Sequence, residues 1–213
     1  MGMNPVLGLV LLLPLAAAAQ VLSSEKEAAL GRQIAAEIRR QQAPPLDLPE
    51  VQAWIDRIGR QLASGFRPGI PWTFELTGDE TSVEPMSAPG GFVFVPAGAI
   101  LSATGADDFA RRLAHQMGHV ANPNSMRPAR TEGTNLASIP LVFMGGWLGH
   151  GHGVLVPKAL TPHAQQLEEE ADALASQALA QAGDLAVADF NKIQQLVRGK
   201  PKPARRPPTL HRK

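Results

Sequence analysis

Hydrophobic residues recur along much of the chain at the three-to-four-residue spacing of an amphipathic helix. The pattern predicts a helix from Ser24, which forms a capping box with Glu27, to about residue 40. A second helix is expected between Asp47 and Gly65, because its large apolar residues fall on one face. Start and stop signals place three further helices at about residues 104–120, 161–181 and 184–199.

Two short segments have the pattern of strands. Trp72 to Thr77 alternates bulky and polar side chains, and Gly91 to Val95 is a short apolar run after a turn signal. Residues 136–155 are apolar and rich in glycine, and their periodicity leaves open a loop-and-hairpin cap, a core segment or a membrane-touching surface. We therefore predict a mainly helical α+β domain with a small β-sheet, covering residues 24–199.

The two ends of the chain differ in composition from this domain. An apolar run at residues 6–15 is followed by four alanines, so residues 1–19 are expected to be a cleaved signal peptide. The protein would then be exported, to the periplasm or another extracytoplasmic space. Residues 200–213 are basic and rich in proline, which predicts a solvated tail, with a basic arm for an acidic surface as the alternative.

Composition limits the chemistry that the domain can perform. Lys and Arg number 20 against 19 Asp and Glu, so the net charge of +1 gives no reason to expect a nucleic-acid partner. The chain has no cysteine, which excludes a disulfide framework, a thiolate metal site and a cysteine nucleophile. A metal ion would have to be bound by His, Asp or Glu.

Two pairs of such residues lie four positions apart on predicted helices. His115 and His119 share one face of the helix at 104–120, where two imidazoles can bind a single metal ion. Glu168 and Asp172 have the same spacing on the helix at 161–181. Each pair alone also has a structural explanation, as histidines that flank a buried helix face or as a solvated acidic face.

Three segments together resemble the gluzincin metallopeptidases of the CAAX-prenyl-protease and HtpX-like type, especially their small periplasmic members. Met86 to Val95 is similar to the family's Pro-Gly-Gly edge strand, and Leu113 to Val120 to its Leu-Ala-His-Glu-x-Gly-His-Val helix. Glu168 to Asp172 is similar to its Glu-x-x-x-Asp helix. The resemblance covers about residues 24–200 and implies a zincin-like domain, with a small sheet beside the metal-binding helix. The implied activity is that of a zinc-dependent endopeptidase acting on envelope or misfolded proteins.

The resemblance also implies a role for each matching residue. His115, His119 and Glu168 would bind one Zn²⁺ ion and leave its fourth position open, as in catalytic zinc sites. Asp172 would accept the hydrogen bond that fixes the tautomer of an imidazole. An extended or unfolded polypeptide would pair with the edge strand Phe92 to Val95 and present its carbonyl to the metal. The residues of the substrate-binding strand would be Gly91, Phe92, Val93 and Phe94.

The chain departs from the family's pattern at Gln116, where the family has a glutamate that takes a proton from the zinc-bound water. A neutral amide cannot accept that proton, and general acid-base assistance contributes roughly 10²–10⁴-fold, so we expect slow hydrolysis at best. The change could be an engineered inactivation, a natural pseudopeptidase, or a sign that Glu84, Glu169 or Glu170 supplies the base; we rank natural change first. The alternatives to a peptidase are a catalytically inactive zinc protein that binds extended peptides, and a structural protein without metal.

The remaining candidates are less specific. Family members carry a His or Arg downstream of the glutamate ligand that can stabilise the oxyanion, and Arg206, before two prolines, is the nearest match. Arg206 also lies in the segment expected to be a disordered tail. His150 and His152 are expected in a flexible loop, with an accessory metal or lid site as the alternative.

Overall fold

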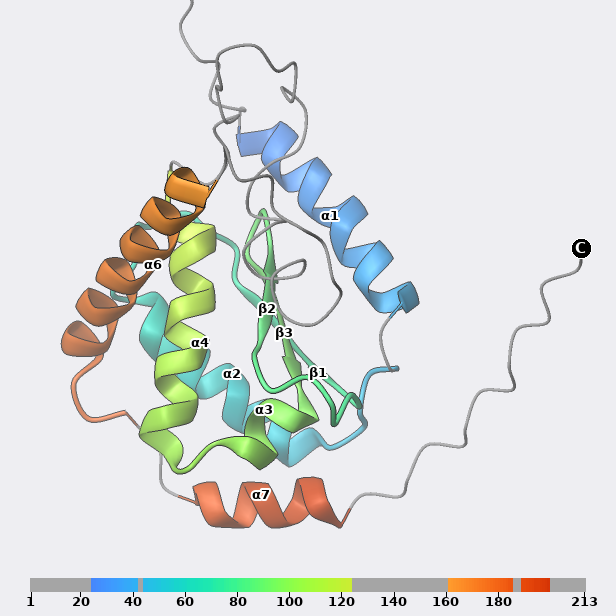
Figure 1. Ribbon diagram of the computed structural model, residues 1–213. Coiled ribbons are helices and arrows are strands. Elements are labelled where there is room, and N and C mark those ends of the chain that lie inside the picture. Colours follow the sequence, from blue (N-terminus) through green and yellow to red (C-terminus); the bar gives the residue numbers. More distant parts are fainter. Residues whose placement is uncertain (1–23, 42–43, 124–160, 186–188, 200–213) are drawn as a thin grey trace, which may run out of the picture.

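The computed structural model describes residues 24–41, 44–123, 161–185 and 189–199, and within them the chain is mainly helical α+β with one three-stranded sheet (Figure 1). The proposed signal peptide, the basic tail with Arg206, the segment 136–155 and its two histidines lie outside these ranges. The elements in chain order are α1 (Ser24–Gln41), α2 (Pro49–Ala63), β1 (Thr73–Thr77), β2 (Met86–Ala88), β3 (Phe92–Pro96), α3 (Ala97–Ser102), α4 (Ala106–Ala121), α6 (Thr161–Ala182) and α7 (Phe190–Arg198).

The strands are arranged in the order β1-β3-β2. β3 pairs with β1 in parallel and with β2 in antiparallel orientation, the latter after a turn in which Gly90 and Gly91 both have positive φ. The expectation that Phe92 to Val95 is an edge strand is therefore wrong, because both of its edges already carry backbone hydrogen bonds. The outer strand on that side is β2, which packs against α4.

Alternation along β3 divides the core between the two faces of the sheet. Val93 and Val95 join the larger cluster, which α2 and α4 line, whereas Phe94 packs with residues of α1. The guanidinium group of Arg39 lies 5.5 Å from the centre of the Phe94 ring, and its Nε donates a 2.8 Å hydrogen bond to Glu75 of β1. α1 thus covers the face of the sheet opposite to α2 and α4 (Figure 1).

Several element boundaries differ from those expected. α2 begins at Pro49 with Leu48 as its N-cap, not at Asp47, because the fixed φ of proline and its missing N–H suit the first helical turn. The helix expected from Asp184 starts only at Phe190, after Asp189 adopts a φ of 73°. The sequence pattern does not predict β2 and α3, since elements of three and six residues are too short to show a clear period. None of the described helices has the length and apolar character that a membrane crossing requires.

Candidate metal centre

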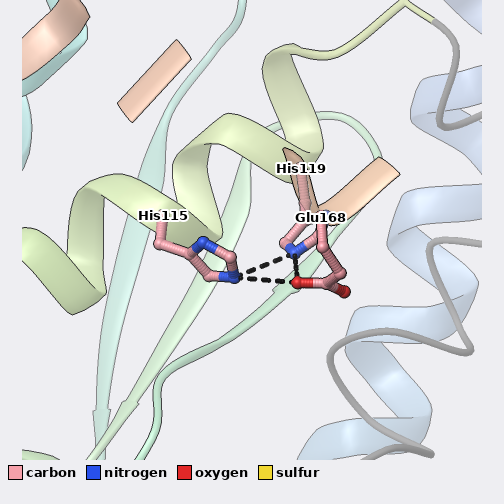
Figure 2. A group of neighbouring side chains, drawn as sticks. All are labelled: His115, His119 and Glu168. Atoms are coloured by element: carbon pink, nitrogen blue, oxygen red, sulfur yellow. Dashed lines mark hydrogen bonds and ion pairs between the residues drawn. The ribbon is translucent and has the colours of Figure 1, made fainter. Parts of the chain in front are cut away.

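Three side chains from two helices meet at one point. His115 and His119 come from one face of α4, and Glu168 comes from the N-terminal half of α6, which lies alongside α4. Figure 2 shows the two Nε2 atoms and one carboxylate oxygen directed toward one another. His119 is nearly buried, with 7 % of its side chain exposed, whereas Glu168 is 42 % exposed. The cluster is therefore anchored in the core and reachable from solvent.

The distances within the cluster match those between ligands of one tetrahedral ion. His115 Nε2 lies 3.1 Å from His119 Nε2 and 3.3 Å from Glu168 Oε2, and His119 Nε2 lies 3.4 Å from the same oxygen. Atoms bound to Zn²⁺ at about 2.0–2.1 Å in a tetrahedron are separated by about 3.3–3.4 Å. These three residues can hold a metal ion, and His₂Glu is a donor set that suits Zn²⁺.

A hydrogen bond outside the cluster orients one of its imidazoles. The Nδ1–H of His115 donates to Asp172 Oδ1 at 2.7 Å, so in the neutral imidazole the Nε2 lone pair is directed at the cluster. Without metal, an N–H on one of the two Nε2 atoms can donate a hydrogen bond within the cluster. The hydrogen bond to Glu168 raises the pKa of His115, and hydrogen bonds from His115 and His119 hold the pKa of Glu168 far below its usual value.

Asp172 lies where the resemblance implies, one turn after Glu168 on α6. Its carboxylate is largely exposed and contacts His115 from the side away from the cluster. An outer hydrogen-bond acceptor of this kind fixes the orientation of a ligating imidazole and increases its basicity. α6 therefore supplies both a candidate ligand and the residue that orients another candidate ligand.

Gln116 faces the sheet from the helix that carries both histidines. Its side chain is buried, with 3 % of the residue exposed, and its Oε1 accepts a 3.4 Å hydrogen bond from Ser87 Oγ on β2. Gln116 thus lies on the flank of α4 that faces the outer strand. Sequence reasoning missed Ser87, because only the pairing of β2 beside α4 brings the two residues together.

Two of the acids considered as replacement bases are engaged elsewhere. Glu84 lies 3.7 Å from Arg112 Nη1, and Arg112 is itself paired with Asp108 at 2.8 Å. Glu169 is exposed and accepts a hydrogen bond from Gln165 on the outer surface of α6. Neither carboxylate joins the group formed by the two histidines and Glu168.

Glu170, the third such acid, links the two helices. Its Oε2 accepts a 2.8 Å hydrogen bond from Asn122 Nδ2, and Asn122 is the buried C-cap of α4. Hydrogen bonds to a charged group contribute about 1.5–3 kcal/mol. The sequence indicates Asn122 only as a helix stop, since nothing local points to a partner 48 residues away.

Gly118 allows α4 and α6 to approach closely at this site. A Cβ atom added there would lie 2.5 Å from the carbonyl oxygen of Ala171. Gly118→Ala is expected to lower the free energy of unfolding by about 1–3 kcal/mol and to weaken metal binding, because α6 and Glu168 must move outward. Thermal unfolding and zinc titration measure the two effects.

Gly59→Ala provides the matched control for this prediction. A Cβ atom at Gly59 would lie 2.3 Å from the ring of Phe74, in the core between α2 and β1. This variant should lose stability and keep its metal affinity. Equal loss of metal affinity in both variants would show that the effect of Gly118→Ala is general destabilisation.

No protein-family model and no curated protein sequence matches the chain. The assignment of function therefore depends on the geometry of the cluster and on the motifs in the sequence.

Proposed function

We propose that this protein is a zincin-like, Zn²⁺-dependent binding protein that holds extended polypeptides beside its metal centre and hydrolyses them slowly at most. The observation that carries the proposal is the triangle of His115, His119 and Glu168 atoms at the spacing of a tetrahedral ion. Zn²⁺ in such a site acts as a Lewis acid toward a carbonyl oxygen. The gluzincin-like order of motifs supports zinc and a polypeptide ligand.

The outer strand β2 is the element that we propose for pairing with the polypeptide. It is at one edge of the sheet and packs against α4, and Ser87 at its centre contacts the residue that follows His115. An extended segment added to this edge would gain main-chain hydrogen bonds and run past the imidazoles. This role replaces the one expected for Phe92 to Phe94, whose strand lies in the middle of the sheet.

Slow hydrolysis follows from the side chains around the centre. Gln116 cannot take up a proton, and Glu84 and Glu170 are held by Arg112 and Asn122. Peptide hydrolysis remains the second candidate function, because His115 and Glu168 are partly exposed and a ligand can reach them.

We propose an exported location on the basis of the apolar N-terminal run, with a role in quality control of envelope proteins.

A binding experiment with an unfolded protein tests this function. We expect the zinc-loaded chain to bind casein, to lose that binding when a chelator removes the metal, and to leave most of the casein intact after prolonged incubation. Zinc content, binding and gel electrophoresis are measured on the same sample. Casein binding that is unaffected by the chelator, or a chain that retains no zinc, would refute the proposal.

A further inference from the structure

The amide of Gln116 has two chemically different ends, and the outer strand occupies one of them. Ser87 Oγ donates to Oε1, so the NH₂ group, which can only donate, is the end left for a ligand. In the part of the chain that the structure describes, the Ser87 hydroxyl is the one hydrogen-bond partner of this side chain. The end of Gln116 that remains for a ligand is therefore a hydrogen-bond donor, on the residue next to His115.

The charge around the centre also favours an anionic ligand. A divalent ion held by two neutral imidazoles and the Glu168 carboxylate carries a net charge of +1. Asp172 adds a negative charge nearby, but 71 % of its side chain is exposed and water screens it. A glutamate at position 116 would add a second, buried negative charge, and the neutral amide does not. A monoanion at the open side brings the half-buried centre closest to neutrality, and an uncompensated charge there is costly.

Among the groups of a polypeptide, a carboxylate both accepts hydrogen bonds and carries a single negative charge. One of its oxygens can face the cation while the other accepts a hydrogen bond from the NH₂ group of Gln116. A peptide carbonyl oxygen is neutral and forms the weaker kind of hydrogen bond with an amide. Compared with a glutamate at this position, Gln116 cannot act as a base. It supplies a hydrogen-bond donor instead, and it places no negative charge beside a bound carboxylate.

We propose that Gln116, oriented by Ser87, makes the metal centre a receptor for a carboxylate group of a bound polypeptide. The carboxylate is either the free C-terminus or an acidic side chain, since both have the same chemistry. This site depends on the function proposed above, because a chain that binds neither Zn²⁺ nor polypeptides has no such receptor. A carboxylate is then the class of group that the centre selects within a bound polypeptide.

Three peptides of one ten-residue sequence without acidic residues test the proposal. The first has a free C-terminal carboxylate, the second a C-terminal amide, and the third a C-terminal amide with one internal glutamate. Dissociation constants are measured by calorimetry with the zinc-loaded full chain, and mass spectrometry checks that the peptides stay intact. We expect the first or the third peptide to bind about 10- to 100-fold more tightly than the second, as hydrogen bonds to charged groups predict.

Gln116→Glu is the matched variant, since it keeps the shape of the side chain and replaces the neutral NH₂ donor with a negatively charged acceptor. We expect it to lose most of the preference for a carboxylate, measured as the ratio of its affinities for the carboxylate peptides and the amidated peptide, with mass spectrometry checking that each peptide is still intact. Tighter binding of only the first peptide identifies a C-terminal group, and of only the third a side chain; either supports the proposal.

Three outcomes would overturn the proposal, and they are distinguishable. Zinc-dependent binding of all three peptides with equal affinity would refute carboxylate selection and leave the proposed function intact. A chain that binds zinc but none of the peptides, or binds no zinc, would refute the proposed function and the carboxylate site with it. A preference that survives unchanged in Gln116→Glu would show that another residue selects the carboxylate.

Discussion

Gln116→Glu is expected to raise the rate of peptide hydrolysis by the zinc-loaded protein by roughly 10²–10⁴-fold, the usual contribution of general acid-base assistance. A glutamate of the same length would be positioned by the hydrogen bond from Ser87 and would lie on the flank of α4 beside the imidazoles. There it can take a proton from the attacking water and deliver it to the leaving amine. Cleavage of a fluorogenic peptide or of casein measures the gain.

The double variant Gln116→Glu, His119→Ala is the control for this gain in activity. It keeps the new carboxylate and lacks a metal ligand, so its rate should fall back to that of a blank without enzyme. Equal rates for the native chain and Gln116→Glu would contradict the prediction. Fast cleavage by the native chain, lost in the single variant His119→Ala, would mean that another residue of the native chain acts as the base.

Glu168→Ala is expected to weaken zinc binding by more than about 100-fold. Loss of a residue that only hydrogen-bonds to a ligand already weakens metal binding by up to about 100-fold, and loss of a ligand should cost more. The variant removes one corner of the ligand triangle and leaves two imidazoles whose Nε2 atoms lie 3.1 Å apart. It also removes the negative charge that balances part of the ion's charge. Competition with a chelator of known affinity measures the loss.

Glu169→Ala is the neighbouring control on the same helix. Glu169 is exposed and accepts its hydrogen bond from Gln165 on α6 itself, so removing its carboxylate should leave zinc affinity unchanged within about twofold. Each of the two variants, Glu168→Ala and Glu169→Ala, removes one negative charge, and the two positions are adjacent on α6. Similar effects of the two variants would indicate that general electrostatics, and not ligation by Glu168, determines the affinity.

The sequence predicts the local part of this site well. The spacing of His115 and His119 places both imidazoles on one helix face, because a helix repeats every 3.6 residues. α1, α4 and α6 end within a few residues of the predicted positions, since apolar periodicity and turn residues are local signals. The absence of cysteine and the presence of Gln116 between the histidines also narrow the chemistry, because both follow from residue identity alone.

The pairing of distant segments needed the tertiary structure. β3 became the middle strand and β2 the outer one because each pairs with residues far along the chain or across a turn, and strand order is not encoded in a period. The same holds for the contact of Ser87 with Gln116 and of Asn122 with Glu170.

Local sequence therefore determined which side chains could bind a metal and that an amide follows the first histidine, because helical spacing acts within one or two turns. Only the packing of α4 against α6, which Gly118 permits, decided that Glu168 meets both histidines at ligand distance. That distance depends on the summed packing of the core, in which no single local pattern sets the separation of two helices.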